Sequence, residues 1–147
     1  MKTYKRPESV LVVIFSHDGG RVLMLQRHDD PDFWQSVTGS LEEGESVEQT
    51  ARREVKEETG IDIEAERLPL HNCQRSVTFE IFTHFRHRYA PGTTHNLEHW
   101  FCLALPAERE VELSEHDAYR WVDARQAALM TKSWSNRQAI EEFCCDC

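Results

Sequence analysis

Three glutamates, Glu54, Glu57 and Glu58, occupy the last turn of an expected helix, where negative charge is unfavourable. A helix C-terminus carries partial negative charge, so each carboxylate there costs a few tenths of a kcal/mol to about 1 kcal/mol. Glu54 and Glu58 also form a like-charge pair four residues apart, which weakens a helix by roughly 0.2–0.5 kcal/mol. Taken alone, the three glutamates are most simply interpreted as a solvated helix face. A helix that keeps these carboxylates despite both unfavourable effects nevertheless indicates that they have a function.

The spacing of these glutamates suits a metal ion. Residues at i, i+3 and i+4 share one helix face, so the three carboxylates are expected to converge. Oxygen ligands that converge on one point suit hard cations such as Mg²⁺ or Mn²⁺. Gly39, which has no side chain, would let the preceding loop fold back and offer a backbone carbonyl. Arg53 and Lys56 flank the cluster and could lessen its repulsion or hold a carboxylate in place.

The helix that carries the cluster has clear boundaries in the sequence. Ser46 and Gln49, three residues apart, predict a capping box at its start. Gly60 lies where a C-terminal glycine would end the helix. The expected apolar stripe consists of Val47, Thr50, Ala51 and Val55.

Strand patterns occupy most of the remaining chain. Residues 10–16 and 21–27 predict a hairpin whose turn has the sequence His-Asp-Gly-Gly. Further strands are expected over residues 61–74, 76–89, 98–105 and 119–122, with a loop over residues 90–97. Two closing helices are expected over residues 123–130 and 135–144, with Asp123 and Ser135 as N-caps. This order predicts an α/β (α+β) fold in which a mixed sheet is sandwiched between helices, without the regular alternation of a parallel sheet.

Length and charge restrict the class of protein. A chain of 147 residues favours a single domain over residues 1–147. The formal charge of −9, from 26 acidic and 17 basic residues, argues against a nucleic-acid or acidic-membrane surface. An anionic substrate would need a local counter-charge, which a divalent cation supplies. No apolar run reaches the roughly 18 residues of a membrane span, and Pro7 and Glu8 interrupt the signal-peptide-like N-terminus, so a cytoplasmic location is expected.

The five cysteines are not spaced as a disulfide framework. Reduced thiols in a cytoplasmic protein are expected. Three of them, Cys144, Cys145 and Cys147, crowd the terminus, where a solvated tail is favoured over a soft-metal site.

Four histidines raise the alternative of a transition-metal site: His84, His87, His95 and His99. If residues 76–89 form a strand, His84 and His87 point to opposite faces. These histidines are therefore interpreted as mostly exposed polar positions.

The complete stretch over residues 39–61 resembles the signature of the Nudix hydrolase family. All of its specified positions match: Gly39, Glu45, Arg53, Glu54, Val55, Glu57, Glu58, Gly60 and Ile61. The resemblance implies a Nudix fold in which the signature forms a loop, a helix and a second loop, with structural roles for Gly39 and Gly60. It also implies Mg²⁺-dependent hydrolysis of a pyrophosphate linkage, with Mn²⁺ as a possible substitute.

The family resemblance assigns roles to the acidic cluster. Glu54 and Glu58 are expected to be direct metal ligands, and Glu57 a ligand to a second metal or a group that orients water. Arg53 and Glu45 are expected to form a structural ion pair. The direct ligands would explain the acidic helix end, because a bound cation reverses the local electrostatics.

Nudix enzymes often use another carboxylate from outside the signature as a base or ligand. Glu115 is the candidate here, because it precedes a strand in the later half of the chain. Asp117 is the rival, and either residue could be an ordinary loop charge.

Outside the signature, nearly the full chain resembles a bacterial Nudix subfamily that acts on a pterin triphosphate in folate synthesis. Many Nudix proteins carry Pro-Gly-Gly before the signature loop, where this chain has Val37-Thr38-Gly39-Ser40. The resemblance implies that Lys5 and Arg27 contact the triphosphate and that the Thr38 hydroxyl bonds the substrate. It also implies a ring-binding wall and a pocket-closing residue: Phe79, Glu80, Ile81 and Phe82, and Ser133. Without the resemblance, Arg27 would be read as a surface charge and the two phenylalanines as core residues.

Two alternatives stay open at the level of sequence. One is a Nudix hydrolase of nucleoside triphosphates such as dATP, or of dinucleoside polyphosphates. The other is a binding module of the Nudix fold that does not cleave its ligand, although such modules usually lack glutamates that this chain retains. A monomer is expected in either case.

Overall fold

The computed structural model describes residues 3–18 and 20–143 and contains one seven-stranded mixed sheet. Its main path runs in the order β3-β2-β1-β6-β5, while β4 pairs with β1 and β7 pairs with β2. The strands are β1 (Glu8–Ser16), β2 (Val22–Arg27), β3 (Trp34–Gln35), β4 (Val37–Ser40), β5 (Leu70–Glu80), β6 (His95–Leu105) and β7 (His116–Val122).

The centre of the sheet is a parallel pair of strands. β1 and β6 run in register from Glu8 opposite Leu97 to Ser16 opposite Leu105. Every residue of β1 after Glu8 is buried, as its continuous run of Val, Leu, Ile and Phe predicts for a central strand. The other pairings are antiparallel, so the predicted mixed sheet is confirmed.

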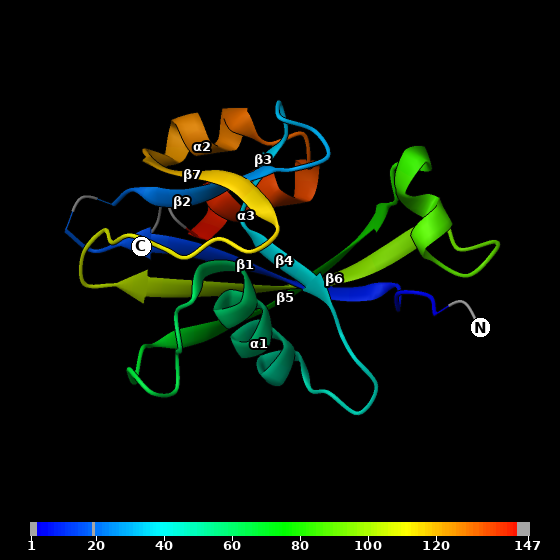
Figure 1. Ribbon diagram of the computed structural model, residues 1–147, viewed down its shortest axis with the longest axis horizontal. Helices are drawn as coiled ribbons and strands as arrows, with labels where there is room; N and C mark the ends of the chain where they lie inside the picture. The colour runs from blue at the N-terminus through cyan, green and yellow to red at the C-terminus, as the bar shows by residue number, and fades with distance from the viewer. Residues whose placement is uncertain (1–2, 19, 144–147) are drawn as a thin grey trace.

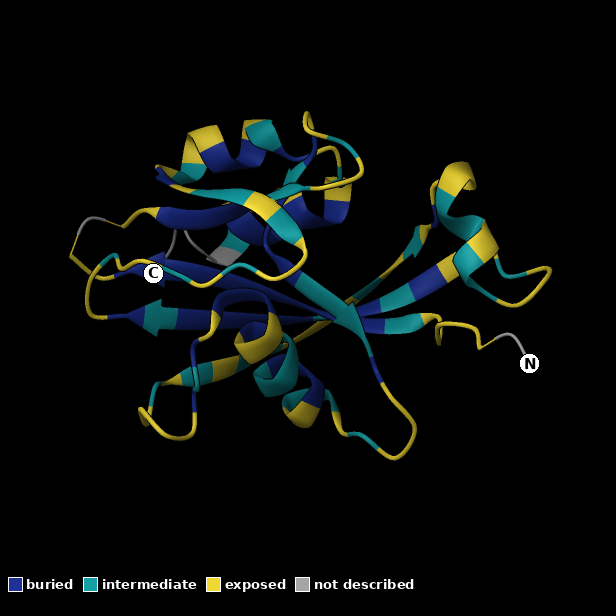
Figure 2. Cartoon of the chain, viewed as in Figure 1, coloured by how far each residue is buried: buried dark blue, intermediate teal, exposed yellow. Residues whose placement is uncertain are grey.

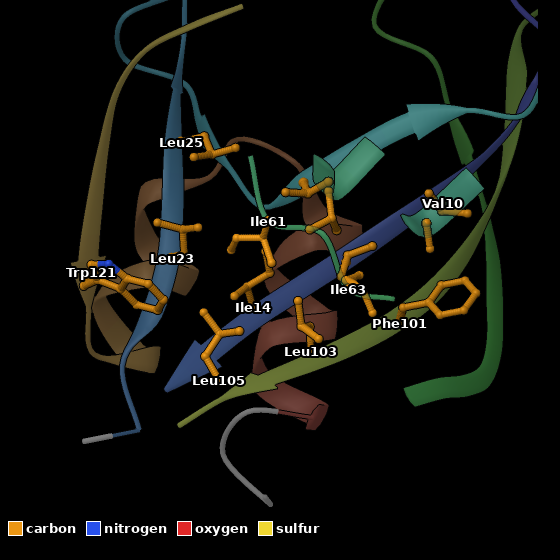
Figure 3. Packing of buried hydrophobic residues seen from close by; sticks show 14 of the residues in the cluster. Val10, Ile14, Leu23, Leu25, Ile61, Ile63, Phe101, Leu103, Leu105 and Trp121 are labelled. Carbon is orange, nitrogen blue, oxygen red and sulfur yellow. The ribbon is translucent and has the colours of Figure 1, made fainter. Parts of the chain in front are cut away.

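Helices cover both faces of the sheet (Figure 1). Helix α1 (Val47–Thr59) lies on one face, and helices α2 (Ala124–Met130) and α3 (Trp134–Phe143) lie on the other. Each face has its own apolar cluster. One joins α1 and the turn after it to the sheet and includes Val10, Ile14, Ile61, Phe101 and Leu103 (Figure 3). The other joins α2 and α3 to the sheet and includes Leu11, Val13, Trp100, Ala139 and Ile140.

β1 separates from β2 along most of its length. The two strands pair only where Phe15 meets Val22, and β4 lies beside the first half of β1 instead. β2 continues with β3 on one side and β7 on the other. This division of the sheet positions residues from β2, β3, β4 and β7 around one cavity, described below.

The predicted ends of α1 are confirmed. The Ser46 side chain accepts from the Gln49 backbone N–H, and the Gln49 side chain accepts from the Ser46 backbone N–H. Gly60 ends the helix at φ 78°, in the left-handed region that favours glycine.

The predicted strand over residues 61–74 is wrong in its first part. β5 starts at Leu70, and the preceding residues form a turn in which the Glu66 N–H donates to Asp62 and the Leu68 N–H to Ile63. Ile61 and Ile63 are buried under α1, so their alternation reflects packing of a turn into the core.

The predicted strand over residues 76–89 is also wrong in its second part. β5 ends at Glu80, and η1 (Thr83–Arg88) is a 3₁₀ helix at the tip of the lobe that β5 and β6 form on the right of Figure 1. Local bonds stabilise this turn: the Phe85 N–H donates to Phe82, and the Arg86 guanidinium donates to the Ile81 carbonyl. His84 and His87 therefore lie in a 3₁₀ helix and not on opposite faces of a strand.

Smaller differences concern element starts. β6 begins at His95, inside the predicted loop over residues 90–97, and β7 begins at His116. Asp123 caps α2 as predicted, but Ser135 lies inside α3. The cap of α3 is Ser133, whose hydroxyl accepts from the Asn136 N–H at 3.2 Å.

The cysteine predictions fall partly within the described chain. The sulfur atoms of Cys73 and Cys102 lie 3.4 Å apart, well beyond the length of a disulfide bond. The terminal group Cys144, Cys145 and Cys147 lies outside the described residues. Over residues 3–18 and 20–143, no helix has the length and apolar character needed to cross a membrane.

Candidate active site

The end of β4 and the last turns of α1 meet in very close contact. Gly39 lies opposite Val10 in the β4–β1 pair and faces α1. A Cβ atom at this position would lie 2.0 Å from Cδ of Glu54. Gly39 is therefore required for the approach of the Glu54 carboxylate to the loop, a steric role that differs from the carbonyl ligand expected from the sequence.

Arg53 connects the signature loop to the acidic cluster. Its Nε and Nη2 donate to the two oxygens of Glu45 at 2.6 Å and 3.0 Å, so the predicted ion pair is present. Nη2 also donates to the Ser40 carbonyl at 3.0 Å. Nη1 donates to Glu54 at 2.7 Å and to Glu57 at 3.2 Å. Arg53 thus ties the loop before α1 to the carboxylates near its end.

Lys56 does not join the cluster, contrary to expectation. Its Nζ lies 3.3 Å from Asp62 in the turn after α1. Because Lys56 faces away, Arg53 is the basic residue of the helix that offsets the glutamates.

Two of the three glutamates are buried. Glu58 is 6% exposed, and Glu54 is also largely covered, whereas Glu57 is open to solvent. Burial raises the pKa of Glu54 to about 7, against the lowering effect of Arg53. Burial, with Glu54 next in importance, raises the pKa of Glu58 well above its usual range, and the Thr38 backbone N–H, which donates to it at 3.3 Å, acts in the opposite direction. The residues around these two carboxyl groups therefore supply too little positive charge to offset the cost of ionising them.

The donor set fits a hard divalent cation. It consists of carboxylate oxygens, and a cation beside Glu54 and Glu58 would supply the missing charge. In the described part of the chain, no three His, Cys, Asp or Glu side chains yet converge as metal ligands. Glu54 and Glu57 are turned toward Arg53, and Glu58 toward Thr38. The carboxylates would therefore rotate from these protein donors to share an ion.

A cavity of about 1020 Å³ begins at this acidic cluster. It is at the upper end of the range for small-molecule sites. Its walls include most of the residues predicted to bind substrate: Lys5, Arg27, Thr38, Phe79, Ile81, Phe82, Glu115 and Ser133. The structure thus brings residues from the N-terminus, all seven strands, α1 and the start of α3 to one chamber.

The basic wall of the cavity contains Lys5 and Arg27. Desolvation by the surrounding walls, and then the charge of Arg88, lower the pKa of Lys5. Arg27 makes two bonds to Asp29, at 2.7 Å and 2.6 Å, and its guanidinium lies 4.5 Å from the centre of the Phe85 ring. Since the Arg27 side chain is 16% exposed, the interpretation as an ordinary surface charge is wrong.

Two predicted binding residues differ from expectation. The Thr38 hydroxyl donates to the Val10 carbonyl at 2.9 Å, so its hydrogen is already used. Glu80 points away from the cavity and pairs with Arg86 at 2.7 Å, because neighbouring strand residues face opposite sides.

The structure separates the two candidates for a further carboxylate. Glu115 lines the cavity, and its charge contributes to the raised pKa of Glu58. Asp117 instead pairs with Nδ1 of His28 at 2.8 Å. Of the two candidates, Glu115 is therefore the one that shares the chamber with the acidic cluster.

Sequence reasoning missed several walls of the cavity, among them Phe85, Arg88, Asn96, Glu98 and His116. Asn96 and Glu98 carried a detectable signal, since their spacing of two residues from each other and from the buried Trp100 matches one face of a strand. Asn96 was missed because the start of β6 was assigned to a loop. Phe85 and Arg88 reach the cavity through the 3₁₀ turn of η1, which replaces the second part of the predicted strand over residues 76–89.

Known proteins share both this fold and this sequence. The chain matches the NUDIX domain family over residues 5–143. It is 68% identical to the dihydroneopterin triphosphate diphosphatase of Escherichia coli (strain K12), covering 97% of this chain and 95% of that protein. It is 51% identical to the Haemophilus influenzae protein of the same description, covering 97% and 90%.

A solved structure gives the same result in three dimensions. The E. coli dihydroneopterin triphosphate pyrophosphohydrolase superimposes with a TM-score of 0.97 at 66% identity, covering 99% of this chain and 100% of that chain. The acidic helix end, the loop that Arg53 ties to it and the chamber beside them lie within the matched region. The chain belongs to the Nudix hydrolase family.

Proposed function

We propose that this chain is a Mg²⁺-dependent pyrophosphohydrolase that converts 7,8-dihydroneopterin 3′-triphosphate to dihydroneopterin monophosphate and pyrophosphate in folate biosynthesis. The observation that carries the proposal is the continuity of the chamber, which joins an acidic helix end to a wall of aromatic residues. A triphosphate with a flat ring needs both parts. The 68% identity to a protein described as dihydroneopterin triphosphate diphosphatase supports the choice of substrate.

Glu54 and Glu58 would hold the metal, and Glu57 and Glu115 are the neighbouring carboxylates that could complete its ligand set. Bound Mg²⁺ would polarise the phosphate and lower the pKa of a water molecule. Lys5 would donate to the triphosphate directly. Arg27 would do so by exchanging its bonds with Asp29 for bonds with phosphate. Glu115, whose charge acts on Glu58, would accept a proton from the attacking water.

The ring of the substrate would lie against the apolar part of the chamber. Phe79, Ile81 and Phe82 come from the end of β5 and the residues after it, and Phe85 from η1. Phe82 is 41% exposed, so its ring is open to contact with a bound ligand. We therefore assign ring binding to this wall.

Product analysis tests the proposal. The protein would be incubated with dihydroneopterin triphosphate, dATP and a dinucleoside polyphosphate in Mg²⁺, in EDTA, and in EDTA followed by excess Mg²⁺. We expect pyrophosphate, rather than orthophosphate, from the pterin substrate only when Mg²⁺ is available. Glu58→Gln should lose most of this turnover while remaining folded. Faster turnover of a nucleotide would show that the nucleotide, and not the pterin, is the preferred substrate. Sustained activity in EDTA would refute the metal-dependent chemistry.

We further propose that one catalytic domain over residues 1–147 acts as a monomer in the cytoplasm. The thiols of Cys73 and Cys102, which are not joined in a disulfide, fit a reducing compartment. Light scattering should give a mass near 17.2 kDa, and a mass of twice that value would refute the monomer.

A further inference from the structure

Two buried polar side chains from β6 line the cavity beside its aromatic wall. Asn96 and Glu98 lie two residues apart on the strand and therefore share one face of the sheet. Trp100 continues the same face and belongs to the apolar cluster under α3, so this pair lies on the side opposite α1. Asn96 is 2% exposed and Glu98 is 4% exposed. They are thus separate from the acidic cluster of α1.

The hydrogen bonds of Glu98 leave part of its carboxyl group free. Trp100 Nε1 donates to its Oε1 at 3.0 Å, and the Ser135 hydroxyl bonds to the same carboxyl group. A carboxylate has about four acceptor sites. Two of them therefore stay available on a group that burial has removed from water, and burial also raises its pKa.

Asn96 has an acceptor without any partner. Its Nδ2 donates to the Ser9 hydroxyl at 2.7 Å. Its Oδ1 is buried and has no hydrogen-bond partner. An unmet buried acceptor costs roughly 1–3 kcal/mol, so its presence in the wall of a cavity indicates a ligand that donates to it.

The surroundings of this pair define the shape of the ligand. Phe79 is the cross-strand partner of Asn96 and lies on the same face of the sheet, where it also lines the cavity. An aromatic face next to two hydrogen-bond acceptors suits a flat heterocycle whose edge carries N–H donors.

We propose that Glu98 and Asn96 determine ring specificity by binding the donor edge of a 2-amino-4-oxopyrimidine ring. The ring N3–H and one hydrogen of the 2-amino group would donate to the two oxygens of Glu98. The second hydrogen of the amino group would donate to Oδ1 of Asn96. This assignment rests on the proposed function, because a dihydropterin carries this edge.

The arrangement also predicts which rings are rejected. Guanine has the same 2-amino-oxo edge and should be accepted in part. Adenine has an acceptor nitrogen, N1, where the pterin has N3–H, so it would face the Glu98 carboxylate with a repulsive contact. A site built for such donors discriminates strongly, since the wrong ring leaves its buried acceptors unpaired.

The test compares Glu98→Gln with the unchanged protein on dihydroneopterin triphosphate, dGTP and dATP in Mg²⁺. Glutamine retains the shape and the acceptor for Trp100 but places an N–H₂ group against a ring donor. We expect kcat/KM to fall about 10–100-fold for the pterin and guanine substrates, mainly through KM, and to change less than about threefold for dATP. Calorimetric binding of dihydroneopterin monophosphate without metal should weaken by a similar factor.

Two further variants define the outcome. Glu110→Gln, which changes an exposed glutamate outside the cavity, should leave the turnover of all three substrates unaffected. Glu98→Asp should give an intermediate loss and serves if Glu98→Gln does not fold. An equal loss on all substrates, or pterin turnover within threefold of the unchanged protein, would overturn the assignment. Preference of the unchanged protein for dATP would instead overturn the proposed function.

Discussion

The acidic end of α1 places two carboxyl groups where ordinary folding would not. Glu54 and Glu58 are both buried beside each other, and Arg53 is the only helix cation that the described structure turns toward them. Their raised pKa values mean that ionising them costs folding free energy in the absence of a counter-ion. The account therefore predicts that the site is electrostatically poised for a cation.

This arrangement predicts a pH effect on the stability of the metal-free protein. Burial raises the pKa of Glu54 to about 7, above its value in the unfolded chain. Its contribution to stability is thus fully present below about pH 4.5 and is lost as the pH rises through 7. Glu54→Gln cannot ionise, so its free energy of unfolding should increase relative to the unchanged protein between pH 5 and pH 8, by at most roughly 3 kcal/mol.

Urea unfolding in EDTA at the two pH values measures this difference. Saturating Mg²⁺ should reverse it by stabilising the ionised carboxylates. A difference between the two proteins that is the same at pH 5 and pH 8 would contradict the assignment.

At the scale of residues, the sequence predicted the acidic cluster and missed the polar pair on β6. Glu54, Glu57 and Glu58 follow from spacing alone, because one helix face collects them whatever the rest of the fold does. The position of Glu98 does not follow from spacing, because the pairing of β6 with β5 and the contact of Glu98 with Ser135 place it in the cavity wall. Long-range packing carries that information.

The elements of the signature are held together by contacts between a loop and a helix. Arg53 bonds Glu45 and the Ser40 carbonyl before α1 begins, while its other nitrogen reaches Glu54 and Glu57. Gly39 permits the strand β4 to approach the same side chain of Glu54. Loop and helix therefore behave as one unit.

Arg53→Lys tests the clamp formed by this arginine. Lysine cannot reproduce a planar fork that bonds both oxygens of Glu45, so we expect a loss of about 2 kcal/mol in the free energy of unfolding. Arg52→Lys is the matched control, since Arg52 pairs only with the exposed Glu64 and should lose less than about 0.5 kcal/mol. Denaturant unfolding of both variants measures the two losses in the free energy of unfolding. Equal losses would refute a special role for Arg53.

Gly39→Ala tests the close approach of β4 to α1. The added Cβ would overlap the end of the Glu54 side chain, which is flexible enough to move aside without unfolding the chain. We expect a folded protein whose turnover falls about 100-fold, because the metal-binding carboxylate is displaced. Thermal unfolding tests whether the variant is folded, and steady-state kinetics measure its turnover. Full activity would show that this position of Glu54 is not needed.

At the scale of elements, the sequence predicted α1 well and the β5–β6 lobe poorly. The capping box and Gly60 are local signals that do not depend on other parts of the chain. Residues 76–89 alternate like a strand, but the bonds from Phe85 to Phe82 and from Arg86 to Ile81 turn the chain after Glu80. The aromatic residues there, Phe79, Phe82 and Phe85, recur every three residues and line the cavity wall.

The whole molecule is acidic, with a formal charge of −9, although its proposed substrate is a polyanion. Lys5, Arg27 and Arg88 bring positive charge to the lining of the cavity, and a cation at the acidic end would add to it. Figure 2 shows the buried centre of the sheet continuing between the two helical layers toward the lobe of β5 and β6. The composition predicted the need for a local counter-charge, whereas only the folded chain shows where the basic wall lies.

The measurement that tests the central claim most directly is a competition between dihydroneopterin triphosphate and dATP in one Mg²⁺-containing reaction. The ratio of the two initial rates at equal concentration equals the ratio of their kcat/KM values. The account predicts a strong preference for the pterin, with one pyrophosphate released per molecule consumed. A ratio that favours dATP, or release of orthophosphate from the pterin, would contradict it.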